Sequence, residues 1–172
     1  MAKKWIGYIG VGSLMCAALG CGILYTRQAR LQQTISDKVL RFHVLANSDS
    51  EADQTLKLAV RDRVLQEYGD LLETCTSKEE TLAALKNAQQ EISETAEAEV
   101  LAQGYTYPVR VSLVREEFPF KKYGDLIFPA GVYDALRIEI GEAKGKNWWC
   151  VLYPQMCYVD AAWGYSTEES HV

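Results

Sequence analysis

The chain has 172 residues and a formal net charge of −5, with 18 Lys and Arg against 23 Asp and Glu. This balance argues against a nucleic-acid partner, because phosphate binding needs clustered basic side chains. Setting aside about 30 N-terminal residues leaves roughly 140, a common size for one domain that buries its core without metal ions.

The N-terminal segment is apolar from Trp5 to Tyr25 and has basic residues on both sides. A helix needs about 20 apolar residues to cross the hydrocarbon core of a bilayer, whereas the apolar part of a cleaved signal peptide has roughly 7–15. The length therefore favours an uncleaved anchor. The small residues Ala18 and Gly20 before Cys21 leave a processing site open. Either form predicts that the rest of the chain is exported from the cytoplasm.

Composition divides the chain into four parts. We expect a signal or transmembrane segment at 1–30, a polar linker at 31–37, one domain at 38–160 and a polar tail at 161–172. We find no internal repeat that would divide the domain further.

The first half of the domain is predicted to hold one strand and two helices. Residues 39–46 are mostly apolar and rich in β-forming types, which is typical of a central strand. Ser48 and Ser77 each precede a Glu by three residues, which is the spacing of a capping box. They predict helices over about 48–69 and 77–104, and the polar face of the second is interpreted as solvated.

The second half changes to the alternating pattern of strands that bury one face. Strands are predicted at 109–114, 125–128 and 136–140, with loops containing Pro and Gly between them, and a last hairpin at 147–160. After the N-terminal apolar helix, the order of one strand, two helices and four or five strands predicts an α+β domain with a mainly antiparallel sheet.

Cys150 and Cys157 flank the predicted turn of the last hairpin. A turn there places them opposite each other on paired strands, close enough for a disulfide. Such bonds persist in oxidising compartments, and one closing so short a loop would stabilise the fold by about 2–3 kcal/mol. Two buried free thiols are the alternative. Since no cysteine pair has the CxxC spacing of a zinc site, we expect no metal.

Side chains suited to catalysis are scarce. His43 lies in the predicted central strand and could act as a base with Asp49 or Asp53, or activate Cys150 as a nucleophile. No hydrolase motif or phosphate loop frames either pairing, and a lone histidine in a strand is more often a hydrogen-bonded structural residue. The adjacent pair Trp148–Trp149 could stack on a sugar, although aromatic residues of a hairpin usually pack in the core. The alternatives are therefore a membrane-anchored hydrolase of the cell envelope and a glycan-binding module.

Several long segments resemble the stage II sporulation protein R family. In order along the chain they are residues 39–50, 53–54, 56–58, 60–62, 123–126, 128–131, 133–138 and 145–152. The resemblance covers about 38–160, nearly the whole predicted domain. The chain departs from the family at Ala143, where Gly is common, and at 155–156, where the turn is usually richer in proline, so the hairpin geometry is less certain to follow the family.

This resemblance implies a signalling protein of endospore-forming bacteria and not an enzyme, with no cofactor and no small-molecule substrate. Such proteins are made in the forespore and exported across its membrane into the intermembrane space. There they activate the membrane-bound aspartic protease that removes the pro-segment of sigma factor E in the mother cell. We expect the same protease as the partner here, and contact with the membrane through the N-terminal segment before any cleavage.

For the contact with the partner we predict the turn between the first strand and the first helix of the domain. Functional residues concentrate on loops that rigid elements hold in place. The candidate binding residues are His43, Asn47, Ser48, Asp49 and Asp53. The alternative is that these polar residues only cap the helix.

Overall fold

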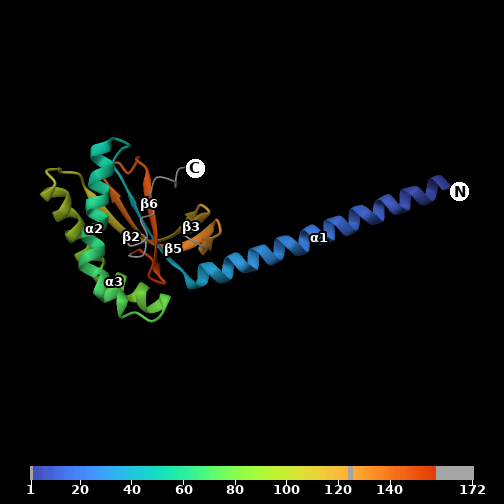
Figure 1. Ribbon diagram of the computed structural model, residues 1–172, viewed down its shortest axis with the longest axis horizontal. Helices are drawn as coiled ribbons and strands as arrows, with labels where there is room; N and C mark the ends of the chain where they lie inside the picture. Colours follow the sequence, from blue (N-terminus) through green and yellow to red (C-terminus); the bar gives the residue numbers. More distant parts are fainter. Residues whose placement is uncertain (1, 124–125, 158–172) are drawn as a thin grey trace. The chain divides into compact units, whose positions relative to one another are not determined.

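The computed structural model describes residues 2–123 and 126–157, with side chains from residue 20 onward. Its contacts divide the chain into two units, Met1–Ile35 and Ser36–Val172. Figure 1 follows the elements along the sequence.

A single helix forms the first unit. Helix α1 runs from Ala2 to Lys38, so residues 31–37, predicted as a linker, are helical. Among the side chains that the structure describes, no helix combines the length and the apolar character needed to cross a membrane. The predicted export segment at 5–25 falls mostly on positions 5–19, whose side chains lie outside this description.

A four-stranded sheet forms the centre of the second unit, in the order β2-β5-β1-β6. Its strands are β1 (Leu40–Leu45), β2 (Val109–Phe118), β5 (Gly131–Ile140) and β6 (Asn147–Tyr153). β1 is parallel to β5 and antiparallel to β6, and β2 is antiparallel to β5. Strands β3 (Lys121–Tyr123) and β4 (Leu126–Phe128) pair as a separate two-stranded sheet. The predicted α+β class with a mainly antiparallel sheet is confirmed, and the first strand is central as predicted.

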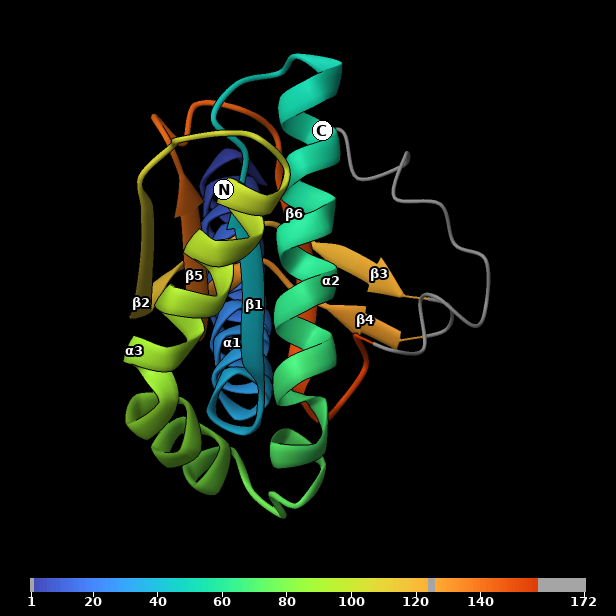
Figure 2. The ribbon, with the colours of Figure 1, turned by 90° about the vertical axis from the view of Figure 1, so that its left-hand side faces the viewer.

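Helices α2 (Glu51–Glu73) and α3 (Lys78–Ala102) lie side by side over one face of the sheet (Figure 2). Alternate residues of the strands point toward them, as the pleat of a strand requires. The resulting core is closed by fully buried side chains from the sheet and from both helices, among them Leu40, Phe42, Val60, Ile92 and Leu136. Burial of this apolar surface is the main force that holds helices and sheet together.

A serine caps each of the two helices, and only the cap of α3 is the predicted residue. Ser77 caps α3 as expected, because its Oγ accepts a hydrogen bond from the backbone N of Glu80 at 3.1 Å. The cap of α2 is Ser50, whose Oγ accepts from the backbone N of Asp53 at 3.2 Å. The prediction that the helix begins at Ser48 is therefore wrong by two residues, because the Ser48 hydroxyl bonds elsewhere.

Of the last predicted hairpin, the residues described up to 157 contain the first strand and a turn. β6 ends at Tyr153, and the chain then turns back so that the backbone N of Met156 donates to the carbonyl oxygen of Val151 at 3.1 Å. Cys157 lies in this turn and not on a strand, which corrects the cross-strand arrangement predicted for it. Residues 158–160 of the predicted hairpin are outside the described part of the chain.

Candidate functional site

The predicted strand-to-helix turn is built around the buried carboxylate of Asp53. Its Oδ2 accepts a hydrogen bond from Ser48 Oγ at 2.5 Å and from Asn47 Nδ2 at 2.9 Å. These two bonds, that of Ser48 first, hold the pKa of Asp53 below its ordinary value because they favour the charged carboxylate. The end of β1 is thereby bound to the first turn of α2.

The same turn is bound to the loop between β5 and β6. Asn47 Oδ1 accepts from the backbone N of Glu142 at 2.9 Å, and Asp49 Oδ1 accepts from the backbone N of Lys146 at 2.7 Å. A Cβ on Gly145 would overlap the backbone carbonyl of Ser48, so the close approach of the two segments requires glycine at that position. We call residues 46–53 and 141–146 together the latch.

A buried lysine completes the latch from the helix side. Lys57 Nζ donates to Gln54 Oε1 at 2.5 Å and to the carbonyl oxygen of Lys146 at 3.0 Å. Both acceptors are neutral, and burial lowers the pKa of Lys57 to about 8. Gln54 Nε2 in turn donates to the carbonyl oxygen of Ser48 at 2.9 Å. The turn is thus held by the protein itself from three elements.

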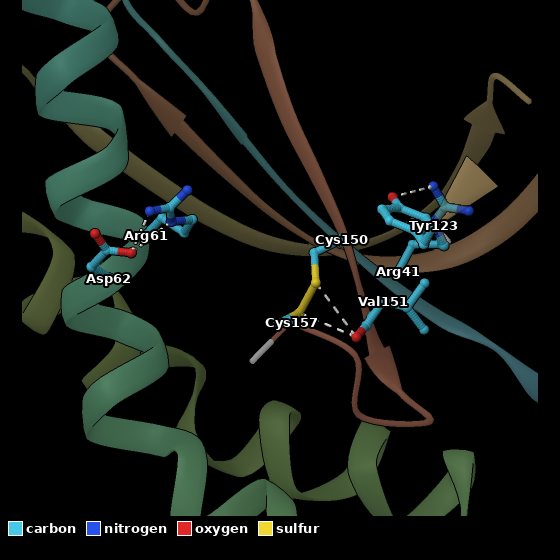
Figure 3. The surroundings of a disulfide bond; sticks show 7 residues. All are labelled: Arg41, Arg61, Asp62, Tyr123, Cys150, Val151 and Cys157. Carbon is cyan, nitrogen blue, oxygen red and sulfur yellow. Dashed lines mark hydrogen bonds and ion pairs between the residues drawn. A yellow bond between two sulfur atoms is a disulfide. The ribbon is translucent and has the colours of Figure 1, made fainter. Parts of the chain in front are cut away.

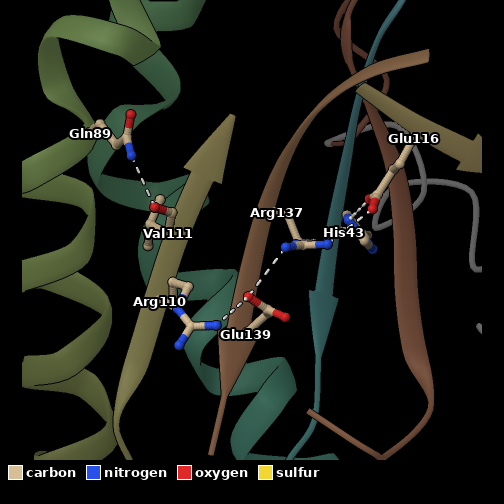
Figure 4. A network of polar contacts seen from close by, with 7 residues as sticks. All are labelled: His43, Gln89, Arg110, Val111, Glu116, Arg137 and Glu139. Atoms are coloured by element: carbon tan, nitrogen blue, oxygen red, sulfur yellow. Dashed lines mark hydrogen bonds and ion pairs between the residues drawn. The ribbon is translucent and has the colours of Figure 1, made fainter. Parts of the chain in front are cut away.

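His43 lies on the other face of the sheet, away from the latch. Its Nε2 is 2.5 Å from Glu116 Oε1 (Figure 4). Its ring stacks on Trp149 with centroids 4.8 Å apart. Burial, followed by the positive charge of Arg137, lowers the pKa of His43 to about 3. The Glu116 carboxylate acts against this direction, because a negative charge beside the ring favours the protonated imidazolium, whereas burial favours the neutral ring. The pairings with Asp49, Asp53 or Cys150 that a catalytic His43 would need are not present among the described residues.

An alternating chain of charges continues from His43 across the sheet. Glu116 Oε2 is 3.1 Å from Arg137 Nη1, and Glu139 lies 3.5 Å from both Arg137 and Arg110. Each residue comes from β2 or β5, and Figure 4 shows the row of side chains along these strands. These ion pairs compensate the charges of the acidic and basic side chains on this face of the sheet. None of the members of this chain of charges, Glu116, Arg137, Glu139 and Arg110, carries a hydroxyl or a thiol.

The two adjacent tryptophans point to opposite faces of β6. Trp148 is buried against Phe42 with ring centroids 5.6 Å apart, and Trp149 stacks on His43. Adjacent residues of a strand cannot share a face. The interpretation of Trp148–Trp149 as one sugar-stacking platform is therefore wrong.

Cys150 in the middle of β6 and Cys157 in the turn after this strand lie together, as Figure 3 shows. Their Cα atoms are 5.5 Å apart and their sulfur atoms are within bonding distance of each other. Both side chains are buried in the core beneath the helices. The expected proximity of the two cysteines is present, although a turn produces it and not a strand pair.

Arg41 was not singled out in the sequence analysis and is completely buried in a box of four aromatic rings. Its guanidinium carbon lies 4.8 Å from the ring centroid of Phe118 and 5.4–5.8 Å from those of Tyr123, Phe128 and Tyr133. Burial lowers its pKa. Among described residues, its one hydrogen bond goes from Nη2 to Tyr123 Oη at 3.4 Å. A charged residue inside an apolar strand was the available signal.

The described ranges, 2–123 and 126–157, contain no candidate metal site. No group of three or more His, Cys, Asp or Glu side chains there is arranged to hold a metal ion. The geometry as a whole defines an α+β domain with two polar clusters, the latch and the His43 row, whose members mainly bond to one another.

Comparison with known proteins identifies the family. The profile of the stage II sporulation protein R family matches residues 36–163. Over 135 residues the chain is 37% identical to stage II sporulation protein R of Bacillus subtilis (strain 168). The matched region covers 78% of this chain and 60% of the length of that protein. No solved structure matches. The chain belongs to the stage II sporulation protein R family, and the resemblance found in the sequence is confirmed.

Proposed function

We propose that the protein is an extracytoplasmic sporulation signal that activates the membrane-bound aspartic protease which processes pro-sigma-E in the mother cell. Its membership of the stage II sporulation protein R family carries this proposal. The protein acts by binding, without catalysis of its own. In support, His43 is 3% exposed and its ring packs against Phe118 and Trp149.

Activation by binding is a shift between two states of the protease. A ligand favours the active arrangement only by as much as it binds that arrangement better than the inactive one. Moving a population from about 1% to about 99% active takes roughly 5.5 kcal/mol of differential binding. A rigid domain suits this task, because little of the binding free energy is then lost in ordering the signal itself.

The proposed site of action is the space between the forespore and mother-cell membranes. The apolar segment at 5–25 would direct export, and the protein then stays anchored or is released. A Cys150–Cys157 bridge suits this location, because disulfides form and persist outside the reducing cytosol.

The contact with the protease was predicted at His43 and at residues 47–53, and this stays a prediction. His43 and Asp53 are 3% and 5% exposed, so they can act on a partner only by holding their neighbours in place. Asp49 and Ser50 are exposed and remain able to touch a partner directly. The latch accounts for the polar residues of the turn without any partner.

The proposed function is tested by producing three proteins together in a bacterium that does not sporulate. These are the full chain with its own N-terminal segment, the membrane-bound protease and pro-sigma-E. We expect the shorter, processed sigma factor to accumulate only when all three are present. A matched control lacks residues 1–37 and is retained in the cytoplasm, where we expect no processing. Absence of processing with a folded, exported full chain would reject the proposal.

A further inference from the structure

Arg41 brings a positive charge into the interior of the domain, where 0% of its surface is exposed. Within the described part of the chain, its Nε and Nη1 have no hydrogen-bond partner. The remaining nitrogen, Nη2, donates to Tyr123 Oη at 3.4 Å, which is long for a hydrogen bond (Figure 3). None of the ion pairs formed among the described residues includes Arg41. Most of the donor capacity of this guanidinium group is therefore unused.

The four aromatic rings around Arg41 offset only part of the cost of burying its charge. A ring attracts a cation through its face, but it is at most a weak acceptor for N–H groups. Removing a guanidinium group from water is costly unless an anion and hydrogen-bond acceptors replace the water. Burial accordingly lowers the pKa of Arg41, and the weaker effects of Tyr123 and Tyr133 in the opposite direction do not cancel it. The box therefore contains a cation that lacks acceptors for its N–H groups.

The ionisable neighbours of Arg41 do not supply a negative charge. Tyr123 and Tyr133 are neutral phenols, and Lys121 is itself basic, with a pKa that is lowered by burial and then by the positive charge of Arg41. The carboxylate of Glu116 lies on the same face of the sheet, but it is already paired with two other side chains. Among the described residues, the guanidinium group of Arg41 thus has no counterion.

The β3–β4 hairpin covers the box, and one end of its inner face reaches solvent. Lys121 is opposite Phe128 and Tyr123 is opposite Leu126, and directly opposed residues share a face of the hairpin. Since the rings of Tyr123 and Phe128 line the box, this shared face is the inner one. Phe128 is only 7% exposed, whereas Leu126 is 55% exposed. The inner face is therefore closed at Phe128 and accessible at Leu126.

We propose that the aromatic box around Arg41 is a binding site for the carboxylate group of an organic acid or of an acidic side chain in a peptide. A carboxylate supplies the absent negative charge and accepts two parallel N–H···O bonds from one guanidinium group. The rings favour a carboxylate on an apolar stem over an inorganic anion. The ligand enters at the Leu126 end, where the hairpin moves because a two-stranded sheet is only marginally stable by itself. The site is independent of the proposed function, because it involves only residues of this chain.

The first test follows the Nε–H resonance of Arg41 by NMR in the full chain, labelled with ¹⁵N-arginine and held in detergent micelles. The resonance is assigned by its loss in Arg41→Met. Acetate is the probe, and chloride at equal ionic strength is the control. We expect acetate to move the Arg41 resonance saturably, while the resonance of the exposed Arg110 shows no saturable change. No saturable movement for Arg41, or the same movement with chloride, would overturn the proposal.

Stability measurements test the same site in a second way. At an acetate concentration of about ten times the dissociation constant, the unfolding midpoint of the wild type should lie about 3–5 °C above its value in chloride. Arg41→Met removes the cation and keeps an apolar side chain in the box, so it should lose this gain. Arg110→Met is the matched control and should keep it. An equal gain in Arg41→Met would show a general salt effect and overturn the proposal. If Arg41→Met does not fold, the NMR titration of the wild type decides alone, with its Arg41 signal assigned by through-bond spectra.

A peptide distinguishes the two sources of the carboxylate. The probe is acetyl-Gly-Glu-Gly amide, in which the Glu side chain carries the only carboxylate, and its control has Gln in place of Glu. Binding of the Glu peptide at least about threefold more tightly than acetate assigns the site to an acidic side chain, and the reverse order assigns it to a free organic acid. Equal movement of the Arg41 resonance by the Glu and Gln peptides would overturn the proposal, because the carboxylate would then contribute nothing.

Discussion

Asn47 Nδ2 donates a hydrogen bond to Asp53 Oδ2 at 2.9 Å, while Asn47 Oδ1 accepts one from the backbone of the β5–β6 loop. One amide side chain therefore connects the end of the central strand, the start of α2 and a loop from the far end of the sequence. Both polar atoms of the Asn47 side chain form hydrogen bonds within the protein, so the role of this residue is structural.

The latch is expected to contribute measurably to stability. Asp53→Asn replaces the charged acceptor of two hydrogen bonds by a neutral amide, and Asn47→Ala leaves the partners of Asn47 unsatisfied. Either change should lower the free energy of unfolding by about 1–3 kcal/mol. The midpoint of urea unfolding measures this change. Asp70→Asn, at an exposed position of α2, is the matched control and should change stability by less than about 0.5 kcal/mol. Equal midpoints for the control and the latch variants would contradict this role.

His43 should make the domain sensitive to acid. Its pKa is about 3 in the folded state, against about 6.5 in an unfolded chain. Between these values the unfolded chain binds a proton that the folded domain does not, so stability falls as the pH is lowered from about 6.5. The expected slope approaches 1.4 kcal/mol per pH unit between pH 6 and pH 4.

His43→Gln is the control for this dependence and should flatten the slope. Asp53, whose pKa lies below its ordinary value near 3.9, acts in the same direction but only at more acid pH. A wild-type domain that gains stability between pH 6.5 and pH 4 would instead show that Glu116 holds a charged imidazolium.

Arg41 should govern the order of the β3–β4 hairpin more than the stability of the core. Arg41→Ala removes the centre of the aromatic box, so Tyr123 and Phe128 lose their packing. We expect at least tenfold faster amide hydrogen exchange across residues 121–128, with little change in β5 and α3. Arg110→Ala, an exposed arginine of β2, is the control. Unchanged exchange in the hairpin after Arg41→Ala would show that the box does not fix it.

The Cys150–Cys157 bridge should be present in the exported protein. The double variant Cys150→Ala with Cys157→Ala cannot form the bridge. Its free energy of unfolding should be lower than that of the wild type by about 2–3 kcal/mol, according to the chain-entropy model. Mass spectrometry of the exported chain after alkylation without reduction reports the pair directly. Alkylation of both residues would show free thiols. Cys75, a free cysteine outside the core, provides the internal positive control.

Much of the fold was predictable because it depends on local pattern. The apolar run at 39–46, the capping serine at 77 and the alternation at 109–114 each act over a few residues. The α2 cap shows the limit of such reasoning. Ser48 and Ser50 both precede an acidic residue by three, and only the tertiary bond from Ser48 to Asp53 decides which serine caps the helix.

The site was harder to predict, because its partners are distant in the sequence. Nothing around His43 indicates that Glu116 would reach it from β2, since β5 lies between the two strands in the sheet. The contacts of Asn47 and Asp49 with residues 142–146 likewise need the fold before they can be seen. The aromatic box around Arg41 also needs the fold, because its four rings come from four different strands, β2 to β5.

The placement of β1 at the centre of the sheet has a consequence for when the domain can fold. Its two neighbours are β5 and β6, with Leu40 opposite Asp134 on one side and Tyr153 on the other. The first strand of the domain to leave a ribosome or a translocation channel therefore waits for the last strands before it gains any sheet partner. Pairings so distant in sequence form slowly. The four-stranded sheet therefore cannot close around β1 until residues 131–153 are available.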